Sequence, residues 1–232
     1  MRSERSNNLS YDEVAPDAYG MIESLRAHGY TLSTALADII DNSISANCSN
    51  IWIKVEWNNG DPWISITDDG KGMSEVELVD AMRLASKNPL DKRSPKDLGR
   101  FGLGLKTASF SQARRLTVLT KKVGSAKSLR RWDLDYLAKP SVSGWRLLKQ
   151  AHEETGDRLD ELQVRKIKSG TVVLLEVLDR IDSHKEEEGQ RTAKNLVFQL
   201  EQVRKHLSMV FHRFMESGAQ SAIKIFLNEN KL

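Results

Sequence analysis

Cysteine is almost absent from this sequence, because Cys48 is the one cysteine among 232 residues. A lone thiol excludes an internal disulfide framework and is typical of a reducing compartment, so we expect a cytoplasmic protein. No apolar run approaches the roughly 18 residues that a membrane-spanning helix requires, and residues 1–5 lack the apolar core of a signal peptide. These absences predict a soluble protein with no membrane partner.

A strong excess of one charge is also missing, since the formal net charge is only +3. This balance gives no strong electrostatic argument for nucleic acid as the main partner. DNA remains an alternative partner, because basic residues cluster around one expected pair of strands. These residues are Arg114, Arg115, Lys121, Lys122, Lys127, Arg130 and Arg131. The five histidines are scattered without a shared helix face for a third ligand, so no zinc-type site is expected.

The apolar content of 39% is enough for one large domain and part of a second. Apolar spacing predicts helices at about 17–27, 31–46, 74–85, 106–112 and 192–215. Strands are expected at 51–57, 63–67, 116–121, 128–134, 145–149, 170–177 and 222–227. Asp17 is a candidate N-cap, and Ser74 with Glu77 forms a capping box. The polar, proline-containing segment 86–98 is typical of a lid.

The helix at 31–46 carries polar residues that a purely structural helix does not need. Asp38 and Asn42 are four residues apart, so they project from one face, one turn above the other. A carboxylate there can take a proton from water, and an amide oxygen can ligate a hard cation such as Mg²⁺. Asp41 is a spare acid that lies on a different part of the helix from Asn42.

Two glycine-rich stretches follow. In the first, Asp68 ends an expected buried strand, and Gly70 and Gly72 let the backbone pass close to a flat ligand. The acid can then accept a hydrogen bond from an exocyclic amine of that ligand. The second, at 99–107, is not a P-loop, because Leu105 stands where that pattern requires lysine and a polar loop precedes it. Glycines before a helix start still present N–H groups to phosphate, and Lys106 adds positive charge.

Taken in this order, these stretches resemble the GHKL ATPases, the superfamily of DNA gyrase B, heat-shock-ninety chaperones, histidine kinases and MutL. The resemblance covers about residues 31–177 and rests on four motifs. They are Asp38 with Asn42; Asp68, Gly70 and Gly72; Gly99, Gly102 and Gly104; and Gly170 with Thr171. Within the superfamily, segments 41–44, 72–73 and 100–106 look most like MORC proteins and their prokaryotic relatives.

The resemblance implies an α+β fold: a two-layer α/β sandwich of the Bergerat type, with a mostly antiparallel mixed sheet and helices on one face. It divides the chain into a flexible N-terminal arm at 1–16, an ATP-binding domain at 17–185, and a linking helix with the start of a truncated transducer domain at 186–232. ATP and Mg²⁺ would be bound. Nucleotide would order a lid at about 86–101 and drive N-terminal homodimerisation of a larger protein.

The same resemblance implies roles for single residues. Asp38 would be the general base of a slow ATPase, Asn42 would hold Mg²⁺, and Asp68 would read the adenine amine with support from Thr171. The nucleotide would also contact loop and helix-start residues. These are Gly70, Gly72, Met73, Gly99, Gly102, Leu103, Gly104 and Lys106.

Two departures from the superfamily pattern leave alternatives open. The base position normally carries Glu, and Asp38 is one methylene shorter; a displacement of about 1 Å can cost on the order of 100-fold in rate. Ser45 also stands where many relatives carry Asp. The second hypothesis is therefore a nucleotide-gated binding and dimerisation module with negligible hydrolysis. A histidine-kinase-like phosphotransferase is a third hypothesis, although His28 is a poor candidate for the phospho-acceptor.

Overall fold

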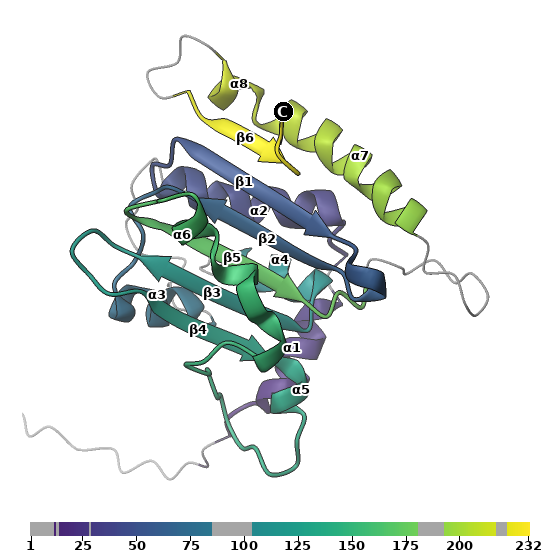
Figure 1. Cartoon of the computed structure of the whole chain (residues 1–232). Coiled ribbons are helices and arrows are strands. Elements are labelled where there is room, and N and C mark those ends of the chain that lie inside the picture. Colours follow the sequence, from purple (N-terminus) through teal and green to yellow (C-terminus); the bar gives the residue numbers. More distant parts are fainter. Residues whose placement is uncertain (1–11, 13, 28, 85–103, 181–192, 217–221) are drawn as a thin grey trace, which may run out of the picture.

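Figure 1 shows the chain as a computed structural model, which describes residues 12, 14–27, 29–84, 104–180, 193–216 and 222–232. Most of the predicted arm at 1–16 and the whole of the predicted lid at 86–101 lie outside these residues. Three predicted site residues, Gly99, Gly102 and Leu103, also lie outside them, as does His28.

Among the described residues, seven strands form one sheet in the order β4-β3-β5-β2-β1-β6-β7. The strands are β1 Asn50–Glu56, β2 Trp63–Asp68, β3 Arg115–Lys121, β4 Ser128–Asp133, β5 Gly170–Glu176, β6 Lys224–Leu227 and β7 Asn230–Lys231. β1 and β6 run parallel, and the other neighbouring pairs are antiparallel. Every residue of the central strands β2 and β5 is buried, as expected for strands covered on both faces. The predicted fold class is confirmed.

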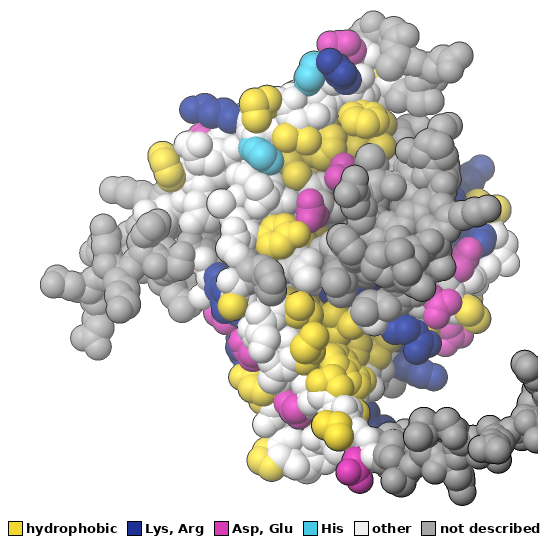
Figure 2. Space-filling model, turned by 180° about the vertical axis from the view of Figure 1, so that it is seen from behind, with side chains coloured by type: hydrophobic (Ala, Val, Ile, Leu, Met, Phe, Trp, Pro, Cys, Tyr) yellow, Lys and Arg dark blue, Asp and Glu magenta, His cyan; other side chains and the backbone are white. Residues whose placement is uncertain are grey.

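The helical elements are α1 Ala18–Arg26, α2 Leu32–Ser45, α3 Glu75–Met82, α4 Gly104–Gln112, α5 Leu134–Leu137, α6 Glu161–Val164, α7 Ala193–Val210 and α8 His212–Met215, with 3-10 segments η1 Asn58–Gly60 and η2 Glu153–Leu159. Helices α1, α2, α3, α4 and α7 pack their apolar sides into one large hydrophobic cluster on one face of the sheet (Figure 1). Seen from behind, this face carries several groups of hydrophobic side chains, and most of the charged ones lie toward its edges (Figure 2). None of the described helices combines the length and apolarity that crossing a membrane would take.

Local signals in the sequence fix where these helices begin. Asp17 caps α1 by accepting a hydrogen bond from the Gly20 amide at 2.7 Å. At α3, the predicted capping box is present: the Ser74 amide donates to Glu77 at 2.7 Å, and the Glu77 amide donates to the Ser74 hydroxyl. Thr31 caps α2. Such caps satisfy amide groups that have no partner within the helix, and each stabilises a helix by about 1 kcal/mol.

The opposite face of the sheet is covered by η2 and α6, which lie in front of it in Figure 1. Leu159 and Leu162 pack there against Trp63, Val172 and Leu174 in a second, smaller hydrophobic cluster. The helices of the large cluster and α6 therefore lie on different sides of the sheet.

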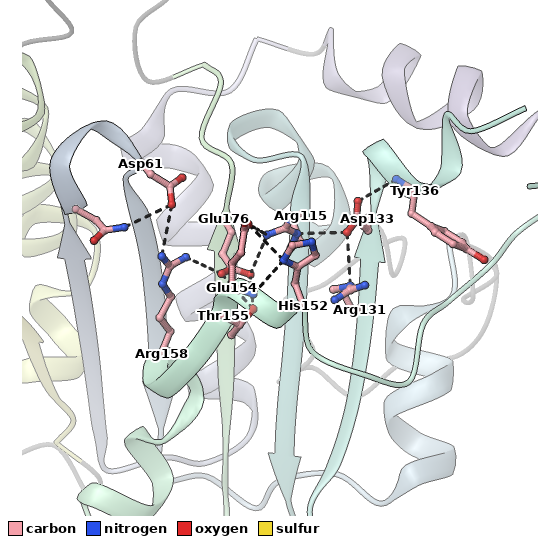
Figure 3. Close-up of polar contacts among 11 residues, drawn as sticks. Asp61, Arg115, Arg131, Asp133, Tyr136, His152, Glu154, Thr155, Arg158 and Glu176 are labelled. Atoms are coloured by element: carbon pink, nitrogen blue, oxygen red, sulfur yellow. Dashed lines mark hydrogen bonds and ion pairs between the residues drawn. The ribbon is translucent and has the colours of Figure 1, made fainter.

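A buried ionic network ties η2 to the sheet on this second face (Figure 3). Its centre is Glu176 on β5, which is only 1% exposed. Glu176 accepts hydrogen bonds from Arg158 at 2.7 Å and from the Thr155 hydroxyl at 3.1 Å. Arg115 on β3 lies 3.9 Å from the same carboxylate and also pairs with Asp133. Because each buried charge has an opposite partner, the network avoids the large cost of an isolated buried ion.

Two predicted elements differ in the structure. The strand expected at 145–149 is wrong: Leu148 makes an isolated bridge to Arg131, with hydrogen bonds of 2.8 and 2.9 Å. Trp145 instead packs edge-on against Trp132, with ring centroids 6.2 Å apart. The long helix expected at 192–215 is interrupted at Phe211, which separates α7 from α8.

Candidate nucleotide-binding site

The carboxylate of Asp68 lies where β2 ends beside α2, and Asp68 is only 4% exposed. Its Oδ2 accepts a hydrogen bond from the Ser43 hydroxyl of α2 at 3.0 Å, and its Oδ1 accepts from the Gly70 amide at 2.9 Å. Burial raises the pKa of Asp68 to about 6, and both hydrogen bonds oppose this rise because they favour the ionised form. At neutral pH the group is therefore mostly a carboxylate, an acceptor in a largely dry setting.

The turn after β2 is built on two glycines that leave no room for a side chain. A Cβ at Gly70 would lie 2.8 Å from the Cβ of Ala46, and one at Gly72 would lie 1.9 Å from the carbonyl oxygen of Lys121. Gly72 also has a φ of +62°, which favours glycine. The Lys71 amide donates to the Ala46 carbonyl at 3.0 Å and so ties the turn to the end of α2. The turn passes between α2 and β3 as bare backbone.

Two threonine hydroxyls join this turn to β5. The Thr120 hydroxyl accepts a hydrogen bond from the Met73 amide at 2.9 Å, and it lies 3.1 Å from the hydroxyl of Thr171. Gly170 is packed so closely that a Cβ there would lie 2.0 Å from the carbonyl oxygen of Asp68. The predicted residues Asp68, Met73 and Thr171 are thus brought together at one end of the sheet.

Helix α2 adds a polar face to the same end. The Asn42 side chain donates from Nδ2 to the carbonyl of Asp38 at 2.8 Å, which leaves Oδ1 as the oxygen that can meet a ligand. Asn42 is exposed, and its neighbour Ser43 is the residue that bonds to Asp68. Asp38 is half-buried, and its Oδ2 accepts a hydrogen bond from the Tyr30 hydroxyl at 2.8 Å. Asp38 and Asn42 therefore lie on the same helix as Ser43, the residue that bonds to Asp68.

Asp41 interacts electrostatically with Asp38, one turn before it on α2. Burial, and then the negative charge of Asp38, raise the pKa of Asp41 to about 6. A carboxyl group whose pKa lies near neutrality can exchange protons at physiological pH. Asp41 is therefore a second candidate for acid–base work.

The start of α4 is the part of the predicted phosphate-binding stretch that the structure describes. Gly104 is the first residue of this helix that the structure describes, and a Cβ there would meet nothing within 4 Å. Lys106 is only 2% exposed, and its ammonium donates to the carbonyl oxygen of Ala81 near the end of α3 at 2.8 Å. The ammonium has three N–H donors, so this bond occupies one of them.

Three residues of the site were not predicted from the sequence: Tyr30, Ser43 and Thr120. Ser43 could have been found, since a small polar residue interrupts the apolar side of a helix near the end of a buried strand. Tyr30 lies just before the α2 cap, where no local pattern marks it. Thr120 depends on the pairing of β3 with β5, in which Thr120 lies opposite Thr171. Pairing between strands so distant in sequence carries no local signal.

Most basic residues considered above for DNA binding have carboxylate partners. The pairs are Arg114 with Glu23 and Asp135, Arg115 with Asp133, Lys122 with Glu77, Arg130 with Glu75, and Arg131 with Asp133. These charges are largely neutralised within the chain, which weakens the argument that this strand pair binds DNA.

The mixed sheet, the five longer helices packed on one face and the glycine turn after a buried acid define the two-layer α/β class of ATP-binding fold. A family model described as "Histidine kinase-, DNA gyrase B-, and HSP90-like ATPase" matches residues 30–171, more than half of the chain. The chain belongs to this family, the GHKL ATPases. Membership implies that the domain binds ATP.

Curated relatives come from several branches of the superfamily. The chain is 29% identical over 96 residues to the ATPase morc-1 of Caenorhabditis elegans, which covers 41% of this chain and 11% of that protein. It is 30% identical over 103 residues to the chaperone protein HtpG of Clostridium perfringens, and the match covers 41% of this chain and 16% of HtpG. It is 30% identical over 97 residues to the DNA mismatch repair protein MutL of Thermoanaerobacter, and the match covers 40% of this chain and 15% of MutL. The matched region is thus less than a fifth of each of these relatives.

Proposed function

We propose that this chain binds Mg²⁺-ATP and hydrolyses it slowly. The observation that carries the proposal is the hydrogen bond between Ser43 of α2 and the buried carboxylate of Asp68, at 3.0 Å. This bond holds the acceptor suited to adenine against the helix that bears Asn42 and Asp38. Base recognition and phosphate chemistry would then be supported by one rigid unit.

Adenine recognition falls to Asp68 in this proposal. The ionised carboxylate accepts an N–H from the exocyclic amine, and a hydrogen bond to a charged group contributes about 1.5–3 kcal/mol. Thr171 lies directly opposite Asp68 in the β2–β5 pair. Gly70 and Gly72 allow the turn to pack closely against Ala46 and Lys121, which would hold the Asp68 carboxylate in position for the base.

Asn42 fits the role of a magnesium ligand. Its Nδ2 is held by the main chain of Asp38, so Oδ1 presents the hard oxygen that Mg²⁺ prefers. Mg²⁺ typically takes one or two protein ligands and completes its shell with phosphates and water. When bound, it would neutralise charge on the phosphates.

Asp38 is the proposed general base. The Tyr30 hydroxyl holds its Oδ2, which leaves Oδ1 to accept a proton from the attacking water. Burial, and then Asp38 itself, raise the pKa of Tyr30, so the hydroxyl keeps its proton and stays a donor. We assign Tyr30 as a positioning residue, which orients a base that is one methylene shorter than the usual glutamate.

The test is phosphate release from Mg²⁺-ATP by the wild type and by Asp38→Asn, with Asp80→Asn, an exposed acid on α3, as control. We expect turnover to fall by about 100-fold or more in Asp38→Asn, because a positioned base contributes at least that factor. The control should retain the wild-type rate. Turnover that persists in Asp38→Asn but is lost in Asp41→Asn would move the base to Asp41.

A nucleotide-gated binding module with negligible hydrolysis is the second candidate. It is favoured by the Lys106 ammonium, which bonds to the Ala81 carbonyl, and by the short side chain of Asp38. Saturable nucleotide binding with no phosphate release by the wild type would support this candidate over the ATPase.

Nucleotide-driven closure completes the proposal: ATP would order a lid at about 86–101 and bring two N-terminal domains of a larger protein together. The lid residues lie outside those that the structure describes. Light scattering of the chain with a non-hydrolysable ATP analogue and Mg²⁺ should give the mass of a dimer. A monomer mass at saturating analogue would contradict dimerisation by this chain.

A further inference from the structure

A hollow of about 330 Å³ lies beside α6, on the face of the sheet opposite α2. Four lysines from three segments line it: Lys121 at the end of β3, Lys127 just before β4, and Lys166 and Lys168 between α6 and β5. The other lining residues, Leu162, Gln163 and Ile167, are uncharged. In Figure 1 this region is where α6 lies in front of the sheet near the turn between β3 and β4.

The positive charge of this hollow has no counter-charge among the described residues. None of the four lysines forms an ion pair with a carboxylate that the structure describes, and no acid lines the hollow. Neighbouring basic residues behave differently: Lys122 pairs with Glu77, and Arg130 pairs with Glu75. Lys127, Lys166 and Lys168 are exposed, so solvent and salt screen part of the repulsion among these like charges, and a bound anion would remove the rest.

The frame that brings the lysines together is fixed by backbone contacts. After α6, the Ile167 amide donates to the Leu162 carbonyl at 2.8 Å, and the Lys166 amide donates to the Gln163 carbonyl at 3.0 Å. Lys166 has a φ of +54°, the left-handed conformation of a residue that closes a helix. Lys121 lies opposite Gly170 in the β3–β5 pair, and Gly170 follows Lys168 by two residues. Gathering the lysines therefore needs no ordering of the backbone.

We propose that this hollow binds a small anion that carries several phosphate groups. Lysine binds phosphate as a point charge, and a single phosphate, with a charge of about −2, would leave about half of the charge of four lysines uncompensated. The site lies across the sheet from Asp68 and does not depend on hydrolysis at that site. It would give the chain an oligophosphate ligand in addition to its nucleotide.

The experiment is calorimetric titration of the chain with tripolyphosphate in EDTA, without Mg²⁺. The pocket variant is Lys166→Gln/Lys168→Gln. The control, Lys205→Gln/Lys224→Gln, removes the same charge from exposed lysines on α7 and β6. We expect the pocket variant to weaken tripolyphosphate binding by about tenfold or more, because each charge-assisted contact contributes substantially. The control should change the Kd by less than about twofold, since exposed distant charges are screened by salt.

Further measurements separate this site from its alternatives. A Lys166→Arg/Lys168→Arg variant should retain binding, and the affinity of the pocket variant for a fluorescent ADP analogue should equal that of the wild type. Equal weakening in the pocket and control variants would mean a diffuse charge effect and would overturn the proposal. Absence of tripolyphosphate binding would overturn it too, as would a pocket variant that binds tripolyphosphate like the wild type. If tripolyphosphate does not bind, but duplex DNA binds and the pocket variant weakens that binding, the hollow would be assigned to nucleic acid instead.

Discussion

Replacing Asp68 with Asn should stabilise the chain while it weakens nucleotide binding. The buried carboxylate makes hydrogen bonds with the Ser43 hydroxyl and the Gly70 amide. Asparagine can keep both, because its Oδ1 accepts from Gly70 and its Nδ2 can donate to the oxygen of Ser43. The substitution therefore removes the buried negative charge with little change of shape.

The size and sign of the effect follow from the pKa. Burial raises the pKa of Asp68 from 3.8 to about 6, so the folded state holds its proton more tightly than the unfolded state. The free energy of unfolding of the wild type should therefore fall as the pH rises from about 4 through about 6, by about 3 kcal/mol for a shift of about two units. The Asp68→Asn variant should not lose this stability, because asparagine does not ionise between pH 4 and pH 8. The variant should match the wild type near pH 4 and exceed it by about 3 kcal/mol at pH 8.

Urea unfolding followed by circular dichroism at several pH values between 4 and 8 measures this difference. Asp41, whose pKa is also raised to about 6, is present in both proteins, so its contribution cancels. A stability difference between variant and wild type that does not change with pH would refute the reasoning. In parallel, the Kd for a non-hydrolysable ATP analogue should rise by at least about tenfold in the variant, since a hydrogen bond to a charged acceptor is lost.

Three further substitutions test the packing around the site and across the sheet. Gly72→Ala should destabilise by about 3 kcal/mol, because a Cβ would lie 1.9 Å from the Lys121 carbonyl at a positive φ; unchanged urea stability would contradict this. Gly104→Ala should stabilise by about 0.5–1 kcal/mol, since the Cβ has open space at the start of a helix; a loss of stability would mean that the site is crowded. Glu176→Gln should cost about 3 kcal/mol, because Arg158 loses its buried partner; a neutral result in urea would show that the network adds nothing.

The elements that could be predicted from the sequence are those with local signals. The capping box of Ser74 and Glu77 and the N-cap Asp17 mark helix starts through contacts within four residues, and the structure has both. The apolar run after Gly170 predicts a central strand, because a strand buried on both faces is apolar throughout. The prediction of a strand at 145–149 was wrong because alternating apolar residues alone cannot distinguish a strand paired along its length from a loop with a single bridge. There Trp145 is held by Trp132 rather than by a neighbouring strand.

In the candidate site, Asp68, Gly70, Gly72 and Thr171 could be predicted because they stand in recognisable motifs. What joins them could not be. The Ser43 bond to Asp68 crosses from helix to strand, and the Thr120 contact depends on strand register, so neither leaves a pattern in nearby residues. The lysine hollow was missed for the same reason, because three separate segments supply its charges.

The central claim is that this domain binds ATP at the group formed by Asp68, Asn42 and Asp38. The most direct test is calorimetric titration of the wild type with a non-hydrolysable ATP analogue, with and without Mg²⁺. The account predicts saturable binding of one nucleotide per chain, stronger with Mg²⁺, and an Asn42→Ala variant in which Mg²⁺ no longer strengthens binding. Absence of saturable binding would contradict the account, and so would Mg²⁺-strengthened binding that Asn42→Ala leaves unchanged.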